Sequence, residues 1–270
     1  MKTFFKYTGG KQKEVKNIKK FFPINTERVI EPFCGAASVS FNFELPSIVS
    51  DLDDNVTNLF NCVKDTTLYN ALQEKIKNTN ISYKDISKNK EHLRDLYYHY
   101  RDDMFNITDP LEKSYRFLLL RQLCFSGMTR INKDGKSNVP FGWYKYFQTR
   151  LDDNHNLLLQ NWKIFNQDFE LTIDMATDRD WLFLDPPYFK RNSKYGINSD
   201  AGSLEDIHKR LANKLCKVNS KWLLIHSDCQ LYRDLYKDYN IIECDHKYMQ
   251  NFKGKAIKNS KVVHLYIMNY

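Results

Sequence analysis

Residues 28–51 read RVIEPFCGAASVSFNFELPSIVSD, and this stretch decides the fold. An apolar strand is expected at 28–33, and the tight-turn residues 34–38 follow it directly. A short helix and a second strand at 48–51 come next, and this strand ends on the carboxylate of Asp51. A strand, a glycine-containing turn, a helix and a second strand tipped by an acid are typical of a nucleotide-binding parallel sheet.

The same alternation of strands and helices continues outward from this stretch. Further apolar strands are expected at 161–165, 181–184, 221–226 and 262–268. Between them lie charged, tyrosine-rich helices, among them 91–105 and 111–123, and a loop with a β-hairpin whose turn is 133–135. We therefore predict an α/β, Rossmann-like fold with a mixed, mostly parallel seven-stranded sheet. Residues 1–55 and 146–270 would form the sheet domain, and residues 56–145 an inserted helical lobe with the hairpin.

The charge of the chain favours a polyanionic partner. Its formal net charge is +8, from 41 basic and 33 acidic residues. The excess is concentrated, because the first 20 residues hold seven lysines and one acid, and more lysines cluster at 247–261. Such clusters suit nucleic acid, although a solvated loop explains the later cluster equally well.

Other classes of protein are disfavoured by composition. Six scattered cysteines form no Cys-x-x-Cys pair, and seven histidines show no ligand spacing, so we expect no metal site. The apolar runs have the length of strands, and the N-terminal lysine-rich segment lacks the core of a signal peptide. We expect a soluble, cytoplasmic protein without a membrane segment.

The most specific motif is Asp185-Pro186-Pro187-Tyr188, which directly follows an apolar strand. The N6 lone pair of adenine is delocalised into its ring, so the nitrogen is a poor nucleophile. A carboxylate and a backbone carbonyl that accept its two N–H bonds would turn the lone pair toward a methyl donor. Pro186 fixes φ and has no N–H, and Tyr188 offers a flat face for an unstacked base. An ordinary turn is the alternative, but the cofactor-type turn upstream disfavours it.

With these motifs in place, the chain resembles the DNA adenine methylase (Dam) family, most closely its short phage-type members. The resemblance covers nearly the whole length and keeps the motif order: cofactor segments, recognition block, catalytic tetrapeptide. It implies a class I S-adenosylmethionine-dependent methyltransferase sheet, with the inserted lobe as a DNA-recognition domain. It also implies methyl transfer from S-adenosylmethionine to adenine N6 in double-stranded DNA, within GATC, by base flipping. Asp185, Pro186 and Tyr188 would be catalytic, and the enzyme a monomer or a weak dimer on DNA.

The resemblance also implies a set of cofactor-binding residues. The segments 6–11 and 33–38 match the family's first two motifs, the second of which wraps the methionine moiety. Asp51 matches the acid that binds the ribose hydroxyls, and 168–169 the motif that brackets the cofactor adenine. The implied set is Tyr7, Lys11, Phe33, Gly35, Asp51, Asp168, Phe169, Asp185 and Tyr195.

A second set of residues is similar to the block with which the family reads GATC. The segments 125–132 and 138–142 carry the match. By resemblance, Phe125 and Ser126 enter the duplex beside the flipped adenine, Met128 and Pro140 touch a thymine methyl, and Arg130 reads a guanine edge. These residue types suit those base edges. The implied DNA-binding set is Lys6, Phe125, Ser126, Met128, Arg130, Asn132, Pro140 and Tyr144.

Alternatives remain for several of these residues. Asp51 could cap the following helix, Arg130 could form a surface ion pair, and Phe125 and Met128 could close the core of a neighbouring helix. The chain departs from the family where Ala36-Ala37 replaces a second glycine and where the hairpin turn lacks an aromatic. Related tetrapeptide sites methylate RNA adenine or protein glutamine, and a catalytically inactive DNA-binding homologue is a further possibility.

Overall fold

The structure is a computed structural model that describes residues 1–79, 90–130, 132, 136–144, 151–188, 203–247, 251–252, 255–256 and 261–270. Its strands are β1 (Arg28–Glu31), β2 (Ser47–Asp51), β3 (Trp162–Asn166), β4 (Asp180–Leu184), β5 (Lys221–Ser227), β6 (Asn240–Lys247), β7 (Asn251–Phe252), β8 (Lys255–Ala256) and β9 (Lys261–Met268). Its helices are α1 (Val15–Ile18), α2 (Ser38–Phe43), α3 (Asp54–Lys64), α4 (Thr66–Lys77), α5 (Lys90–Asp103), α6 (Pro110–Leu123), α7 (Asp153–Leu159), α8 (Phe169–Ile173), α9 (Leu204–Leu215) and α10 (Gln230–Leu235).

Seven strands form one sheet in the order β3-β2-β1-β4-β5-β9-β6. β9 runs antiparallel to both of its neighbours, and the other strand pairs of this sheet are parallel. This confirms the predicted α/β fold class and its mixed, mostly parallel sheet. The strand order reverses between β1 and β4, which is the point where open α/β sheets bind ligands.

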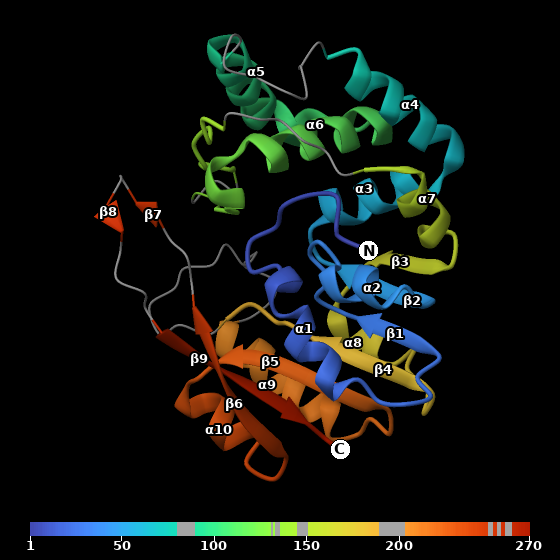
Figure 1. The fold of residues 1–270 in the computed structure, drawn as a ribbon, viewed down its shortest axis with the longest axis vertical. Coiled ribbons are helices and arrows are strands. Elements are labelled where there is room, and N and C mark those ends of the chain that lie inside the picture. The colour runs from blue at the N-terminus through green and yellow to red at the C-terminus, as the bar shows by residue number, and fades with distance from the viewer. Residues whose placement is uncertain are drawn as a thin grey trace.

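Both faces of the sheet are buried, which explains why its strands read as continuous apolar runs. Successive side chains of a strand point to opposite faces. Ile30, Leu182 and Leu184 pack with α8, α9 and α10, whereas the alternating Trp181 and Phe183 pack with residues of α1 and α2. Figure 1 shows these two groups of helices on opposite sides of the sheet.

The edge strand β6 was not expected from the sequence. It carries charged residues at 243 and 245, and Ile242 is 41% exposed, so its apolar pattern is weak. An edge strand with one solvated side needs fewer apolar residues than a central one. The first strand begins at Arg28 as predicted, but it ends at Glu31 and not at Phe33, because Pro32 lacks an N–H for the ladder.

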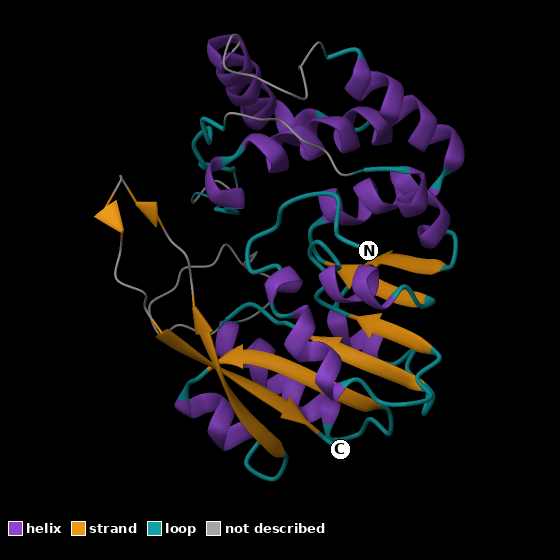
Figure 2. Ribbon diagram, in the orientation of Figure 1, coloured by secondary structure: helices purple, strands orange, loops and turns teal. Residues whose placement is uncertain are grey.

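Helices α4, α5 and α6 stand apart from the sheet, with α3 and α7 between (Figure 2). Asp109 caps α6, its side chain accepting the backbone N–H of Glu112. One buried apolar cluster runs from this group of helices to the sheet, including Leu118, Phe60 and Trp162. The division into domains stays a prediction, because a shared core does not mark a boundary.

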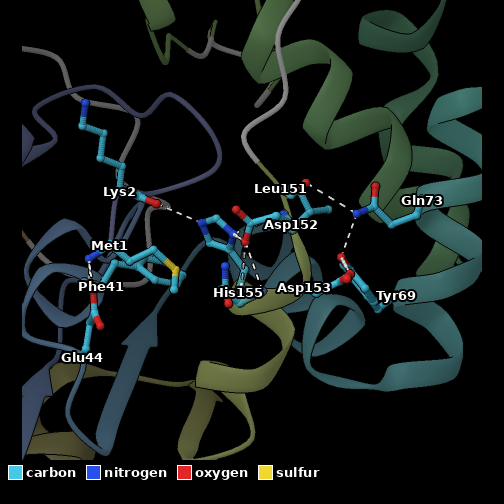
Figure 3. Close-up of polar contacts among 11 residues, drawn as sticks. Met1, Lys2, Phe41, Glu44, Tyr69, Gln73, Leu151, Asp152, Asp153 and His155 are labelled. Carbon is cyan, nitrogen blue, oxygen red and sulfur yellow. Dashed lines mark hydrogen bonds and ion pairs between the residues drawn. The ribbon is translucent and has the colours of Figure 1, made fainter.

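The first residues of the chain are held by partners far along the sequence (Figure 3). His155 Nε2 lies 2.9 Å from the carbonyl oxygen of Lys2, and His155 Nδ1 lies 2.8 Å from Oδ1 of Asp152. Tyr69 on α4 donates to Oδ1 of Asp153 at 2.7 Å. Helix α7 is thereby tied to α4 and to the chain start, which positions the segment at 6–11.

Candidate active site

The tetrapeptide 185–188 continues directly from the buried strand β4. β1 and β2 run parallel to β4 in the same sheet, so their carboxyl ends lie at the same edge. The turn that contains Gly35 follows β1, and Asp51 ends β2. The structure therefore brings Gly35, Asp51 and Asp185 to one edge, beside the reversal in strand order.

Lys11 and Asp185 form an ion pair across 174 residues of sequence. Lys11 Nζ lies 2.6 Å from Oδ2 of Asp185, and it also donates to the carbonyl oxygen of Gly9 at 3.0 Å. The side chains of Lys11 and Asp185 are 4% and 18% exposed. Burial raises the pKa of Asp185 above its usual value, and the nearby Lys11 ammonium opposes that rise. The lysine thus favours the charged carboxylate in a site that would otherwise favour its neutral form.

Tyr188 is half-buried, and its ring lies close to two imidazole rings and to the ammonium of Lys11. Its ring centroid lies 4.9 Å from that of His226 and 5.5 Å from that of His264. Lys11 Nζ lies 5.0 Å from the Tyr188 centroid. Burial lowers the pKa of His226 to about 3, so this imidazole is neutral near pH 7. Pro186 is buried and Pro187 is exposed.

A buried polar cluster beside this site was not found from the sequence. His264 Nδ1 lies 2.9 Å from Oε2 of Glu14, and the Tyr266 hydroxyl donates to the same oxygen at 3.0 Å. Glu14 follows Lys11 by one helical turn, and His264 contacts the ring of Tyr188. The one feature of the sequence that could have pointed to this cluster is Glu14, the single acidic residue among the lysines of the first 20 residues. The cluster fixes β9 against the segment that carries Lys11.

The turn after β1 requires glycine at position 35. Gly35 has φ +46°, and a Cβ added there would lie 2.7 Å from Cδ1 of Tyr7. The ring of Tyr7 therefore lies directly on the turn, as expected for two segments of one binding site. Ala37 also adopts a left-handed φ of 48°. Alanine therefore stands at position 37 in a left-handed backbone conformation that glycine adopts more easily.

Asp51 organises the same turn. Its carboxylate accepts the backbone N–H of Gly35 at 2.8 Å and that of Asp53 at 3.0 Å. Burial raises the pKa of Asp51 to about 6. The neighbouring helix α3 is capped by Asp53, which accepts the N–H of Asn55, so Asp51 is not the helix cap. A carboxylate held by backbone donors at a strand tip can accept hydroxyl groups of a ligand.

Two aromatic rings stack near the ends of β1 and β3. The centroids of Phe33 and Phe169 are 5.1 Å apart, with an angle of 29° between the ring planes. Asp168 caps α8, and its Oδ1 accepts a hydrogen bond from Nη2 of Arg210 at 2.9 Å. Two exposed leucines missed from the sequence, Leu52 and Leu171, lie beside Asp51 and within α8. Phe169 is buried and Phe33 is partly exposed, so within this ring pair Phe33 is the side chain that offers apolar surface to a planar group.

The recognition segments form an antiparallel pair. Phe125 N–H donates to the Pro140 carbonyl oxygen at 2.9 Å. Farther along, Asn138 N–H donates to the Arg130 carbonyl oxygen at 3.1 Å, and Asn132 N–H to that of Lys136 at 2.8 Å. This pairing is that of a hairpin, whose predicted turn at 133–135 lies outside the described residues. The Arg130 side chain is exposed and bonds to Asn138 through Nε and Nη2.

Lys6 and Tyr144 meet at the base of this hairpin. Lys6 Nζ lies 3.9 Å from the Tyr144 ring centroid and donates to the Gln122 carbonyl oxygen. Phe125 and Met128 pack partly against the core of the helical lobe, so the core-closing alternative fits their contacts as well. Ser126 adopts a left-handed φ of 53°. Apart from Lys6, which contacts Tyr144 from the N-terminal segment, the predicted DNA-binding residues thus lie on the two paired segments of this hairpin.

Three further predictions concern Tyr195, a metal site and a membrane-spanning helix. Tyr195 lies outside the described residues. Within the described ranges, no group of three or more histidine, cysteine, aspartate or glutamate residues could hold a metal ion. No helix among the described residues is long and apolar enough to cross a membrane.

A model of the D12 class N6 adenine-specific DNA methyltransferases matches residues 7–250. The chain belongs to this family. D12 class enzymes use S-adenosylmethionine as methyl donor and DNA as substrate, so this chain is an adenine-specific DNA methyltransferase.

Relatives cover most or all of the chain. The type II methyltransferase M.MjaIII of Methanocaldococcus jannaschii is 30% identical over 300 residues, covering 100% of this chain and 99% of the relative. M.CviBI of Paramecium bursaria Chlorella virus NC1A is 28% identical over 281 residues and all of both chains. The DNA adenine methylase of Escherichia coli K12 is 27% identical over 247 residues, covering 87% and 84%.

The residues at the sheet edge fit S-adenosylmethionine. The ring of Tyr7 packs on Gly35 so closely that a Cβ would not fit, so this ring covers the turn at position 35. Asp51 offers a carboxylate that can accept ribose hydroxyls, and the partly exposed ring of Phe33, stacked on Phe169, offers apolar surface for adenine. These side chains therefore fit the ribose and the adenine of the cofactor.

Proposed function

We propose that this D12 class methyltransferase flips an adenine out of the GATC sequence and methylates its N6 at the edge of β4. The observation that carries the proposal is the buried Lys11–Asp185 pair beside the ring of Tyr188. A carboxylate kept charged next to an aromatic face suits an amino group on a flat base.

The tetrapeptide residues would orient the amino group. Asp185 and the Pro186 carbonyl accept the two N6 hydrogens, which turns the lone pair out of the ring plane. Pro186 is buried and has no N–H, so it presents an acceptor and no competing donor. Tyr188 supports the base face. When bound, S-adenosylmethionine supplies a methyl carbon made electrophilic by a sulfonium, and the transfer depends on alignment.

The remaining roles follow from placement. Tyr7, Gly35, Asp51 and the Phe33–Phe169 stack would hold the cofactor, with Asp168 supporting the stack through Arg210. The recognition hairpin would enter the major groove, where Arg130 suits a guanine edge and Met128 and Pro140 suit a thymine methyl. The proposed DNA contacts are those of Lys6, Phe125, Ser126, Met128, Arg130, Asn132, Pro140 and Tyr144. We expect action as a monomer or weak dimer inside the cell, where DNA lies.

Two alternatives are disfavoured by specific observations. The family match over residues 7–250 favours DNA over RNA adenine or protein glutamine. A catalytically inactive homologue has no need for a buried lysine that keeps Asp185 charged, and that pair is intact.

The test is to sequence DNA that the pure protein has methylated, which reports base, position and motif together. Asp185→Ala should lower turnover at least ~10²-fold, because it removes an acceptor aimed at the reacting nitrogen. Asp180→Ala is the matched control: Asp180 is a buried, ion-paired aspartate at the opposite end of β4, bonded to Arg28. Near-normal methylation by folded Asp185→Ala would refute the mechanism, and methylation outside GATC would refute the target.

A further inference from the structure

Arg121 lies in the last turn of α6 and belongs to neither set of predicted site residues. It is 6% exposed. Its described hydrogen bonds all go to backbone carbonyl oxygens: Nε donates to Lys6 and Nη1 to Met128, each at 2.9 Å, and Nη2 donates to Gly127. A guanidinium is a rigid fork of donors. Arg121 therefore fixes the backbone at 6 relative to the backbone at 127–128.

The same guanidinium reaches the cofactor turn. Its central carbon lies 5.3 Å from the ring centroid of Tyr7. The Tyr7 ring in turn lies so close to Gly35 that a Cβ on that residue would clash with it. Arg121 thus contacts the residue that covers the turn after β1 and, at the same time, the start of the DNA-recognition segment.

A second, independent link joins the same two segments. The Thr8 hydroxyl donates to the Gly127 carbonyl oxygen at 3.1 Å and accepts the backbone N–H of Thr129 at 2.7 Å. Gly127 has φ +66°, and a Cβ there would lie 3.2 Å from Cβ of Lys6. The segments 6–8 and 127–129 are therefore in close contact through backbone as well as side chains.

We propose that Arg121 is a positioning residue that couples occupation of the cofactor turn to recognition of DNA. Cofactor that packs on Tyr7 restrains the segment 6–8. Arg121 and Thr8 pass that restraint to Gly127 and Met128, and so to the neighbouring Arg130. This inference rests on the proposed function, because it takes Tyr7 as a cofactor contact and the segment from Met128 to Arg130 as the reader of the target.

Coupling of this kind is reciprocal, which makes it measurable from both sides. The probes are S-adenosylhomocysteine and two short duplexes, one with a single GATC and one with that sequence scrambled. The Kd of each duplex is measured with and without saturating S-adenosylhomocysteine, and the Kd of S-adenosylhomocysteine with and without the GATC duplex. The coupling ratio is the Kd measured without the second ligand divided by the Kd measured with it. For the wild-type protein and the GATC duplex we expect a ratio of ~5 to 150, with the same value whether the Kd of the duplex or that of S-adenosylhomocysteine is measured.

Three variants test the residue. Arg121→Lys keeps the charge but cannot span three carbonyls, so its coupling ratio should fall to about one. Thr8→Val removes only the hydroxyl link of an exposed residue and should lower the ratio by a smaller factor. Arg116→Lys, the control, alters another arginine of α6, one that pairs with Glu112 and Asp103, and should keep the wild-type ratio.

The outcomes separate this inference from the function on which it rests. A wild-type ratio of one, or an unchanged ratio in folded Arg121→Lys and Thr8→Val, would overturn the coupling while leaving adenine methylation intact. If Arg121→Lys does not fold, the ratio of Thr8→Val decides alone. Wild-type protein that methylates no adenine in duplex DNA would instead overturn the proposed function.

Discussion

Replacing Lys11 by methionine tests how the site keeps Asp185 charged. Methionine preserves most of the apolar stem but removes the ammonium that lies 2.6 Å from Oδ2 of Asp185. Burial already raises the pKa of this aspartate, and Lys11 is the main group that opposes the rise. An opposite charge at this distance favours the charged carboxylate, so loss of the ammonium should raise the pKa of Asp185 further.

The sign of the effect on activity follows from the proposed mechanism. The reaction needs Asp185 as an acceptor, so the rate falls as pH drops through the pKa of Asp185. In Lys11→Met, the acid limb of the kcat/KM profile should therefore move to higher pH by ~1–3 units. The assay is transfer of labelled methyl groups to a duplex between pH 5 and pH 9, with folding checked by circular dichroism.

Lys209→Met is the matched control for this change. Lys209 also pairs with a carboxylate, that of Glu205 at 2.7 Å, but on the exposed surface of α9. Its removal should leave the acid limb in place. An unmoved limb in folded Lys11→Met would refute the reasoning, because the ion pair would then have no influence on the group that titrates.

Two further substitutions test stability and specificity. Glu31 is 3% exposed, and burial raises its pKa from 4.5 to about 8, so the folded state resists its ionisation. The quantity to measure, by urea titration, is the unfolding free energy of the wild type minus that of Glu31→Gln. This difference should fall by up to ~5 kcal/mol between pH 4.5 and pH 8, and a difference that stays constant would contradict the prediction. Arg130→Ala should lose ~1–3 kcal/mol of discrimination at one outer base pair, measured by competition between GATC and its single-base variants. Arg94→Ala, an exposed arginine on α5 paired with Asp95, is its control, and unchanged discrimination in Arg130→Ala would remove the assigned contact.

The fold was predictable from sequence because its information is local. A run such as Trp181–Leu184 is apolar throughout since both faces of its strand are buried, and the tetrapeptide follows from where that strand ends. The convergence of Gly35, Asp51 and Asp185 followed from parallel strands having their carboxyl ends at one edge. The edge strand β6 was missed because its solvated side dilutes the apolar pattern.

The partners of site residues were not predictable in the same way. Glu14 meets His264 across 250 residues, and Arg121 meets Lys6 across 115. Neither pair leaves a periodicity or spacing in the sequence, and a buried arginine bonded to carbonyls looks like any lysine or arginine of an amphipathic helix. Only the packed structure identifies such residues.

The long reach of these contacts has a consequence for how the protein is made. Lys11 leaves the ribosome 174 residues before its partner Asp185, and Glu14 precedes His264 by 250. These two contacts therefore form only after β4 and β9, respectively, have been synthesised. Contacts so distant in sequence form slowly. We expect nascent chains that stop before β9 to lack the finished site, so that methyl transfer begins only once β9 has been made and has joined the sheet.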